Sequence, residues 1–493
     1  MMVGEESTDL RRAASQVASD IKERALDAKH SCGLFGVFGR TDAVELAYLG
    51  IYAQQHRGQE SAGICAVHDG VIRRHVGLGL VTQVFTPDAM QQIAGHAAVG
   101  HVRYSTTGSC SEMNSQPLLV RHRGGQVAVA HNGNLTNAAH LRRRLEQQGA
   151  IFQTSGDTEV ILHLLARPEY AESADPTAAV LRELEGAFCL LFIFSDRIEA
   201  TRDAFGLRPL CIGKLPDGQF VVASETCALD IVDAEFVRDV APGEIVTLDA
   251  GGLSSRRFLP VDAARPAHCI FEQVYFADPS SDIFGQNVHA FRVALGRQLA
   301  REAPADADLV IPVPNCARCA AIGYSTESGL PNERGFTTHH FAGRSFILPT
   351  QKQRDLTVKM KLNVIREVVR GRRLIVVEDS VVRGTTTRGK MGALRRAGAR
   401  EIHLRVASPP IRHPCYYGID FPDMRELVAT DRTVEQIRQF LEVDSLSYLS
   451  IEGMLRCAAH HGGHYCTACF SGEYPITVAR PFDKLGFERL THV

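Results

Sequence analysis

The sequence of 493 residues lacks both a long apolar run and an excess of charge of one sign. Its longest purely apolar run extends from Ala187 to Phe194, well short of the roughly 18 residues that suggest a membrane span. Lysine and arginine number 54 against 56 aspartates and glutamates, which gives a net charge of −2. We therefore expect no membrane partner and no nucleic acid partner.

Cysteine is also sparse for so long a chain. The 13 cysteines are too dilute for a secreted disulfide scaffold, and their odd number argues against complete pairing. A reducing compartment fits better, so we expect a cytoplasmic protein in which some thiols are ligands or nucleophiles. The composition, 45% apolar and 22% charged, excludes disorder and predicts two or three domains.

The front part of the chain reads as a tail followed by a layered domain. Residues 1–31 are charged and Ala-rich and lack the apolar stretch of a secretion signal. From residue 32 to 266, short β runs alternate with Gly, Asn and Asp turns. Helical stretches are predicted near 136–148 and 158–167. This pattern predicts an α+β domain.

The pattern changes beyond residue 266. Continuous apolar strands such as Leu309–Val313 and Leu374–Val377 are each followed by polar turns and a helix. Such runs indicate a parallel sheet buried on both faces. We place an α/β domain at 267–440 and a separate C-terminal segment at 441–493.

Polar clusters recur in the turns of the front domain. Singly, each is more simply a structural turn. Together with Cys32 they supply a thiol, an arginine for a carboxylate, an aspartate for an ammonium group, and an Asn-Gly pair for an oxyanion. These groups can hydrolyse the side-chain amide of a free amino acid. The clusters are 56–61, 100–106, 131–135 and 155–159.

The missing part of this chemistry is a general base, because no histidine is fixed by sequence beside Cys32. If the tail were removed after Ser31, Cys32 would carry a free α-amine with an ordinary pKa of about 7.7–8.0, which suits a base. One cleavage would then create both nucleophile and base. The simpler alternative is a buried cysteine at the start of a strand.

The motifs CGLFGVFG, HRGQESAG, GHVRYSTTG, HNGNLTN and SGDTE together resemble the amidophosphoribosyltransferase family. The resemblance covers nearly everything after residue 31. It implies an N-terminal-nucleophile glutaminase domain of αββα layers, released by removal of a propeptide. It also implies Cys32 as nucleophile, Asn132 and Gly133 as oxyanion hole, and glutamine binding by three further residues. These three are Arg57, Arg103 and Asp157.

A second motif, at residues 374–386, indicates which molecule accepts the nitrogen. A buried strand ends in two acids and runs through a Gly/Thr loop into a helix, an arrangement that can cradle a phosphate and hold ribose hydroxyls or hydrated Mg²⁺. A generic strand–turn–helix is the alternative. The motif resembles the phosphoribosylpyrophosphate signature of type I phosphoribosyltransferases. The implied binding residues are Arg344, Glu378, Asp379, Ser380, Arg383, Gly384, Thr385 and Thr386.

Three departures from the family pattern stand out. Glu378 occupies a position that is commonly Asp, and Cys316 places a soft thiol where the family usually offers a hydroxyl to Mg²⁺. We still expect Mg²⁺ at Cys316, Glu378 and Asp379. In the catalytic loop, residues 338–341 read Thr-His-His-Phe, which reduces the cations for a departing pyrophosphate to Arg344 and the two histidines.

A third constellation consists of thiols. The C-x-x-C pair of Cys466 and Cys469, with Cys457 and His464 nearby, is compatible with zinc or with uncoordinated structural thiols. The family resemblance instead implies a [4Fe–4S] cluster on Cys269, Cys415, Cys466 and Cys469, as in one branch of the family. We favour the cluster over zinc.

The resemblance implies transfer of ammonia from glutamine to phosphoribosylpyrophosphate, giving 5-phosphoribosylamine, glutamate and pyrophosphate at the start of purine synthesis. It also implies purine nucleotides as feedback inhibitors and a homo-oligomer, a tetramer or a dimer. Two alternatives remain. One is a related amidotransferase with another acceptor, and the other is a regulatory paralogue with weakened transfer.

Overall fold

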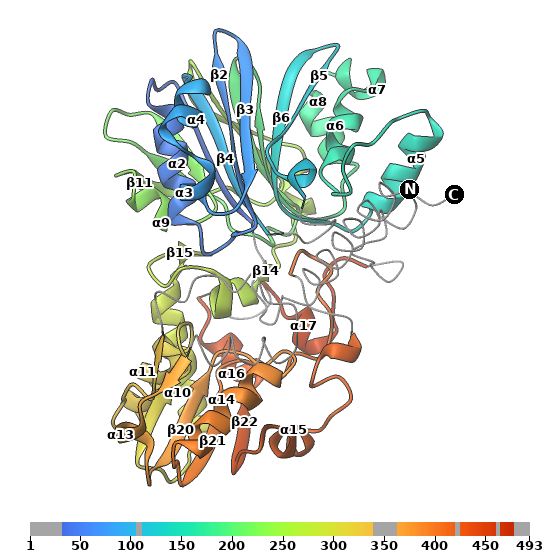
Figure 1. The fold of residues 1–493 in the computed structure, drawn as a ribbon. Helices are drawn as coiled ribbons and strands as arrows, with labels where there is room; N and C mark the ends of the chain where they lie inside the picture. Colours follow the sequence, from blue (N-terminus) through green and yellow to red (C-terminus); the bar gives the residue numbers. More distant parts are fainter. Residues whose placement is uncertain (1–31, 105–110, 339–361, 420–423, 460–463, 478–493) are drawn as a thin grey trace, which may run out of the picture. The chain divides into compact units, whose positions relative to one another are not determined.

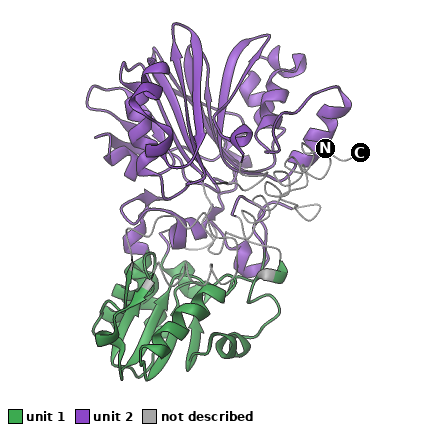
Figure 2. Ribbon diagram, in the orientation of Figure 1, with its two compact units in different colours: residues 1–29, 292–413, 421–457 green, residues 30–291, 414–420, 458–493 purple. Residues whose placement is uncertain are grey.

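The computed structural model describes residues 32–104, 111–338, 362–419, 424–459 and 464–477. They form two compact units that interleave along the chain. The first unit (purple in Figure 2) takes the described residues of 30–291, 414–420 and 458–493, and the second (green) those of 292–413 and 421–457. No helix in the described residues is long and apolar enough to cross a membrane. The expected tail 1–31 and Arg344 lie outside the described residues.

Two antiparallel sheets form the centre of the first unit (Figure 1). The seven-stranded sheet has the order β11-β9-β10-β1-β4-β2-β3, and the six-stranded sheet has the order β13-β12-β8-β7-β6-β5. The first comprises β1 (Gly33–Phe38), β2 (Ser61–His68), β3 (Val71–Leu78), β4 (Ala97–Arg103), β9 (Cys211–Lys214), β10 (Phe220–Ala223) and β11 (Glu235–Asp239). The second comprises β5 (Leu118–His122), β6 (Gly125–Leu135), β7 (Gly186–Ile193), β8 (Arg197–Arg202), β12 (Glu244–Asp249) and β13 (Gly252–Arg257).

Strand β1 shows why this part of the sequence is apolar without interruption. Leu34 and Phe38 belong to the core between the two sheets, whereas Phe35 and Val37 pack toward the helices on the outer face. Because successive side chains point to opposite faces, both faces of β1 are buried. The outer helices are α2 (Ala43–Ala53), α3 (Val81–Val84), α4 (Pro87–Gln92) and α9 (Cys227–Asp230) on one side, and α5 (Ala138–Gln147), α6 (Glu159–Leu165), α7 (Pro168–Ala171) and α8 (Pro176–Leu181) on the other.

The four layers confirm the predicted αββα architecture, and α5 and α6 lie where helices were expected. Additional short elements complete this unit. They are η1 (Glu112–Asn114), η2 (Val261–Ala263), β14 (His268–Cys269), η3 (Glu272–Phe276), β15 (Asp282–Ile283), β16 (Gln286–Asn287), β23 (Tyr465–Cys466) and α17 (Ala468–Ser471). Strand β14 pairs with β23 in parallel, so residues near 268 and 465 lie side by side.

The second unit contains the expected parallel sheet, with strand order β17-β20-β21-β22. Its strands are β17 (Leu309–Pro312), β20 (Arg373–Glu378), β21 (Glu401–Val406) and β22 (Ser445–Tyr448), and a separate pair is formed by β18 (Phe336–Thr338) and β19 (Leu362–Val364). The helices are α10 (Val288–Glu302), α11 (Arg318–Ser328), α13 (Arg366–Val369), α14 (Thr385–Arg396), α15 (Val434–Leu441) and α16 (Ile451–Arg456), with the turn η4 (Met424–Glu426). Leu374 and Val376 of β20 and Met391 and Leu394 of α14 share one buried core.

Candidate active site and thiol centre

Cys32 lies directly before β1 and is only 6% exposed. Pairing of β1 with β4, with Gly33 opposite Val102, fixes its backbone beside the end of β4. The Cys32 Sγ lies 3.7 Å from the carbonyl oxygen of Tyr104, and the Arg57 Nε donates to the Cys32 carbonyl at 2.8 Å. The thiol is therefore placed beside the end of β4, and the Cys32 backbone is held by Arg57 from the turn before β2.

A polar pocket opens at Cys32. Arg103, from the end of β4, and Asp157, just before α6, line it together with Gly133 and Thr158. It thus brings together one fixed cation and one carboxylate beside a thiol. A zwitterionic amino acid carries the complementary carboxylate and ammonium groups.

Asp157 is 5% exposed, and it is held by the backbone and by a histidine. Its Oδ2 accepts the Leu135 N–H at 2.9 Å, and its Oδ1 lies 3.6 Å from the His131 Nδ1. Burial alone would raise the pKa of Asp157, but His131 and the backbone N–H groups lower it below its ordinary value. Asp157 is therefore ionised at neutral pH.

Asn132 and Gly133 lie near the end of the long strand β6. The Asn132 Nδ2 is buried and has no hydrogen-bond acceptor in the described part of the chain. Gly133 has φ of 154°, and a Cβ there would lie 2.0 Å from the Ala187 carbonyl oxygen, so only glycine fits this approach. An unpaired buried donor is rare in proteins, and a developing oxyanion would satisfy it.

The Cys32 thiol is protonated at neutral pH. Burial raises its pKa above the ordinary value, although a backbone hydrogen bond with Tyr104 and the guanidinium groups of Arg103, Arg57 and Arg208 oppose this rise. Nucleophilic attack therefore requires a base that removes the proton.

Arg57 was expected to bind glutamine and Asn132 to stabilise an oxyanion, but neither is among the residues that line the pocket. The Arg57 side chain is completely buried behind Cys32 and forms ion pairs with Glu225 and Glu272. Conversely, His131 lines the pocket and was not among the predicted site residues. Its position directly before Asn132 in the HNGN motif was the signal available.

In the second unit, β20 ends at Glu378, and the turn that follows leads into α14. The Glu378 Oε1 lies 3.2 Å from the Lys390 Nζ, and the Ser380 Oγ donates to the Asp379 Oδ1 at 2.9 Å. Gly384 caps α14 with φ of 78°, a left-handed conformation that glycine adopts without strain. The predicted strand, two acids, turn and helix are thus present in that order.

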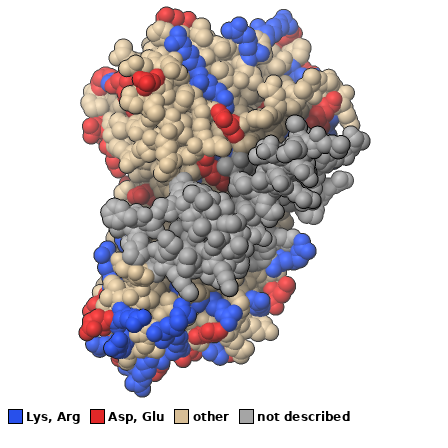
Figure 3. Space-filling model, viewed as in Figure 1, with Lys and Arg blue, Asp and Glu red and all other residues tan. Residues whose placement is uncertain are grey.

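The face of the second unit around α14 is rich in basic side chains (Figure 3). Helix α14 itself carries Arg388, Lys390, Arg395 and Arg396. Three of these four side chains form ion pairs, Arg388 with Glu442, Lys390 with Glu378 and Arg395 with Asp444. Cys316 lies half-buried in the turn between β17 and α11, and β17 is next to β20 in the sheet.

Four buried or half-buried cysteines converge in the first unit although they are far apart in sequence. Cys269 of β14 and Cys466 of β23 are paired across the two strands, and Cys469 lies in α17. The pKa of Cys269 is raised to about 12, mainly by burial and in smaller part by Glu272 and the Cys415 thiol. Burial also raises the pKa of Cys469, and so do the thiols of the other three cysteines. Each thiol therefore lies within electrostatic reach of the others.

The spacing of these thiols can be compared with that of a zinc site. A tetrahedral zinc site with Zn–S bonds of about 2.3 Å places its sulfurs about 3.8 Å apart. Among the described residues, His56, Glu225 and Cys227 form the only group of three or more possible ligands whose ligand atoms all lie within 4.8 Å of one another. No three of the four thiols are therefore that close together in this structure.

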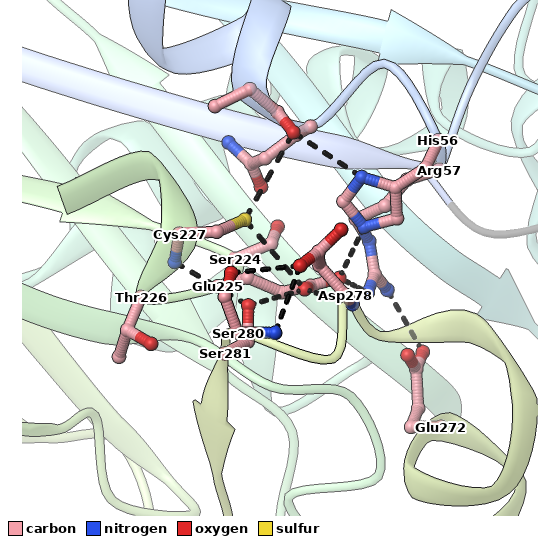
Figure 4. A network of polar contacts seen from close by, with 12 residues as sticks. His56, Arg57, Ser224, Glu225, Thr226, Cys227, Glu272, Asp278, Ser280 and Ser281 are labelled. Atoms are coloured by element: carbon pink, nitrogen blue, oxygen red, sulfur yellow. Dashed lines mark hydrogen bonds and ion pairs between the residues drawn. The ribbon is translucent and has the colours of Figure 1, made fainter. Parts of the chain in front are cut away.

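The His56, Glu225 and Cys227 group is better explained as an ion-pair network (Figure 4). Glu225 forms ion pairs with both His56 and Arg57, and its Oε2 accepts the Asp278 N–H at 2.8 Å and the Ser281 hydroxyl at 2.7 Å. Both carboxylate oxygens are engaged, and the Arg57 charge would repel a cation.

This chain is similar to known proteins over most of its length. Residues 101–230 match the family model described as a glutamine amidotransferase domain. The amidophosphoribosyltransferase of Methanothermobacter thermautotrophicus is 44% identical over 94% of this chain and 98% of its own length. That of Synechococcus elongatus is 44% identical over 95% and 96%.

Solved structures extend the similarity to the fold. The glutamine phosphoribosylpyrophosphate amidotransferase from B. subtilis, complexed with ADP and GMP, has a TM-score of 0.84 and 43% identity. The match covers 91% of this chain and 98% of that one. With the relatives matched across nearly their full length, the chain belongs to the amidophosphoribosyltransferase family.

Proposed function

We propose that this protein transfers the amide nitrogen of glutamine to phosphoribosylpyrophosphate, forming 5-phosphoribosylamine, glutamate and pyrophosphate in the first step of purine synthesis. The observation that carries the proposal is 44% identity to an amidophosphoribosyltransferase across 98% of that relative's length. The matched region spans both the Cys32 pocket and the Glu378–Thr386 loop. The similarity therefore supports both the glutamine half-reaction and the phosphoribosyl half-reaction.

In the first half-reaction, Arg103 binds the α-carboxylate of glutamine and Asp157 binds its α-ammonium group. Cys32 attacks the carboxamide, and the Asn132 Nδ2 and the Gly133 N–H stabilise the oxyanion. Ammonia leaves, a thioester remains on Cys32, and water releases glutamate. The unpaired Asn132 donor supports this assignment, because it has an oxygen to bind only when substrate is present.

The base for this attack is the α-amine of Cys32, set free by removal of residues 1–31. The raised pKa of the buried thiol is the reason that a base is needed. A free α-amine has an ordinary pKa of about 7.7–8.0 and is partly unprotonated at neutral pH. Arg57 holds the Cys32 carbonyl, so the backbone that carries this amine is fixed.

In the second half-reaction, residues 379–386 bind the 5′-phosphate of phosphoribosylpyrophosphate through N–H groups, hydroxyls and the start of α14. Glu378 and Asp379 hold the ribose hydroxyls, and Arg344 binds the pyrophosphate. Ammonia then attacks C1 of the ribose and displaces pyrophosphate.

The acidic pair also fits a magnesium ion. Carboxylate oxygens are its preferred protein ligands, and Mg²⁺ binds through one or two of them together with substrate phosphates. Cys316, by contrast, offers soft sulfur, so we assign the ion to Asp379 and Glu378 first. When bound, Mg²⁺ neutralises charge on the departing pyrophosphate.

The four thiols fit a [4Fe–4S] cluster, which takes four cysteine ligands and is larger than a single zinc ion. Cys269, Cys415, Cys466 and Cys469 would hold it. Arg208 lies close enough to lower the pKa of Cys269 and of Cys415, and it thereby opposes the effect of burial. The Arg208 charge therefore favours the anionic thiolates that bind iron. The B. subtilis enzyme binds ADP and GMP, and we propose purine nucleotides as regulators here, in a cytoplasmic homo-oligomer.

A product assay tests the proposed function. Purified protein is incubated with glutamine, Mg²⁺ and phosphoribosylpyrophosphate, and glutamate and pyrophosphate are measured. We expect both products in equal amounts, and little glutamate when phosphoribosylpyrophosphate is omitted. Glutamate without any pyrophosphate would indicate another acceptor. Binding of phosphoribosylpyrophosphate without turnover, even with ammonia, would indicate a regulatory paralogue.

A further inference from the structure

A buried chain of alternating charges lies between Cys32 and the thiol centre. The Arg57 Nη2 and the Arg208 Nη1 both donate to the Glu272 Oε1, at 2.9 and 2.7 Å. All three residues are at most 1% exposed. Figure 4 shows Arg57 between Glu272 and Glu225. Buried ions of this kind keep their positions because each needs the others for compensation.

The two ends of this chain are fixed to the two sites. At one end the Arg57 Nε donates to the Cys32 carbonyl at 2.8 Å. At the other end the Arg208 Nη2 donates to the Tyr417 carbonyl at 2.8 Å, and the Tyr417 N–H donates to the Cys415 Sγ at 3.4 Å. Four successive polar contacts therefore join the nucleophile's backbone to a segment that carries a cluster cysteine.

Glu272 is linked to the thiol centre through Cys269, a different cysteine from the one near Tyr417. It begins η3, three residues after Cys269, and so its position depends on where Cys269 is held. Both Cys269 and Cys415 thus determine the geometry of the chain. Removal of whatever the thiols bind would loosen Glu272 and Tyr417 together.

A second connection reaches the oxyanion side of the pocket. The Asn134 Nδ2 donates to the Tyr416 carbonyl at 2.9 Å. Gly418 packs so closely on Gly133 that a Cβ on Gly418 would lie 2.9 Å from the Gly133 carbonyl carbon. The segment after Cys415 therefore supports both the nucleophile and the oxyanion donors.

We propose that Arg57, Glu272 and Arg208 are positioning residues that couple the four-thiol centre to the glutamine site, so that occupancy of one site stabilises the other. The inference rests on the proposed roles of Cys32 and of the four cysteines. Because such coupling is reciprocal in binding, it can be measured from either site.

The first experiment uses the unmodified holoenzyme. Cys32 is labelled with an electrophilic diazo-ketone analogue of glutamine, and loss of iron to a chelator in air is followed by the cluster's visible absorption. We expect iron loss to be about fivefold or more slower in the labelled protein, within the usual range of coupling between sites. Equal rates before and after labelling would overturn the proposal.

A variant separates coupling from general stability. Glu272→Gln removes the shared carboxylate, and Glu244→Gln is the matched control, because Glu244 is a buried partner of Arg238 elsewhere in the same unit. We expect Glu272→Gln to slow labelling of Cys32 and to leave ammonia-dependent synthesis intact. We also expect this variant to lose the protection of iron, meaning the slower iron loss that labelling causes in the native protein. Glu272→Asp should restore part of the protection.

Protection in Glu272→Gln equal to that in Glu244→Gln would overturn the proposal. If Glu272→Gln does not fold, the comparison of iron loss from labelled and unlabelled native protein still tests the coupling.

Failure of the cluster assignment can be distinguished from failure of the coupling. Protein that lacks iron but is labelled at Cys32 refutes the cluster and the coupling together, whereas iron-containing protein that is labelled without any protection refutes only the coupling.

Discussion

At the scale of single residues, the glutamine site consists of a buried thiol with a raised pKa, an ionised carboxylate and an unpaired amide donor. Of these three, the buried unpaired amide donor costs free energy in an empty pocket. That cost is offset when the substrate supplies an oxyanion. Substitutions should therefore affect glutamine chemistry far more than folding.

Cys32→Ala tests the nucleophile. We expect glutamine-dependent synthesis to fall at least about 10³-fold, as for loss of other covalent nucleophiles, while ammonia-dependent synthesis survives. Cys65→Ala is the control, because Cys65 is equally buried in β2 but does not line the pocket. Steady-state rates with glutamine and with ammonium chloride give the comparison. Equal loss with both nitrogen donors would contradict the assignment.

Asp157→Asn should raise the KM for glutamine about 10- to 150-fold, the effect of losing about 1.5–3 kcal/mol from a charge-assisted contact. Asp175→Asn, at the start of α8 and outside the pocket, should leave KM unchanged. A normal KM in Asp157→Asn would show that another group binds the ammonium.

Asp157 also makes a prediction about pH. Its folded-state pKa lies below the ordinary 3.8, so ionised Asp157 stabilises the fold fully above about pH 4. That contribution is lost as the pH falls through the lowered pKa. Denaturant unfolding between pH 3 and 6 should therefore show a weaker acid dependence in Asp157→Asn than in the native protein.

At the scale of elements, the start of α14 depends on one glycine. Gly384→Ala would place a Cβ in a left-handed conformation 3.1 Å from Phe440, and we expect a loss of about 1–2 kcal/mol together with weaker phosphoribosylpyrophosphate binding. Gly389→Ala is the control, because its Cβ would meet nothing within 4 Å in the same helix. This control should gain up to about 1 kcal/mol.

Denaturant unfolding and the KM for phosphoribosylpyrophosphate measure both variants. Equal stability of Gly384→Ala and Gly389→Ala would contradict the account of this turn.

The elements themselves were largely predictable. Strands β17 and β20 follow from continuous apolar runs, and α5 and α6 from helical patterns, because burial on one or both faces produces a recognisable pattern of apolar residues in the sequence. The pairing of β14 with β23 could not be predicted from a sequence pattern, because each strand has only two residues and its position depends on tertiary contacts.

The site was predictable to a different degree. Motif resemblance pointed to Cys32, Arg103, Asp157 and Gly133, which the pocket brings together. The burial of Arg57 behind Cys32 was not predictable, because an arginine's partners are set by residues as distant as Glu225 and Glu272. Local sequence cannot distinguish an arginine that binds substrate from one that forms a buried ion pair.

At the scale of the whole molecule, the thiol centre joins segments from residues 269, 415, 466 and 469. Metal binding by such distant ligands contributes directly to folding free energy. We expect anaerobically purified protein to be brown and to contain about four irons per chain. Cys466→Ser should lower the yield of folded protein and its iron content, whereas Cys211→Ser, a buried thiol outside the centre, should retain iron. Stoichiometric zinc in colourless, active protein would contradict this prediction.

The central claim is that one chain moves the amide nitrogen of glutamine to C1 of the phosphorylated ribose. The most direct test supplies amide-¹⁵N glutamine, phosphoribosylpyrophosphate and Mg²⁺ in the presence of excess unlabelled ammonia, and measures ¹⁵N in trapped 5-phosphoribosylamine by mass spectrometry. The account predicts product enrichment close to that of the glutamine amide. Product with the isotopic composition of the bulk ammonia, or no phosphoribosylamine at all, would contradict it.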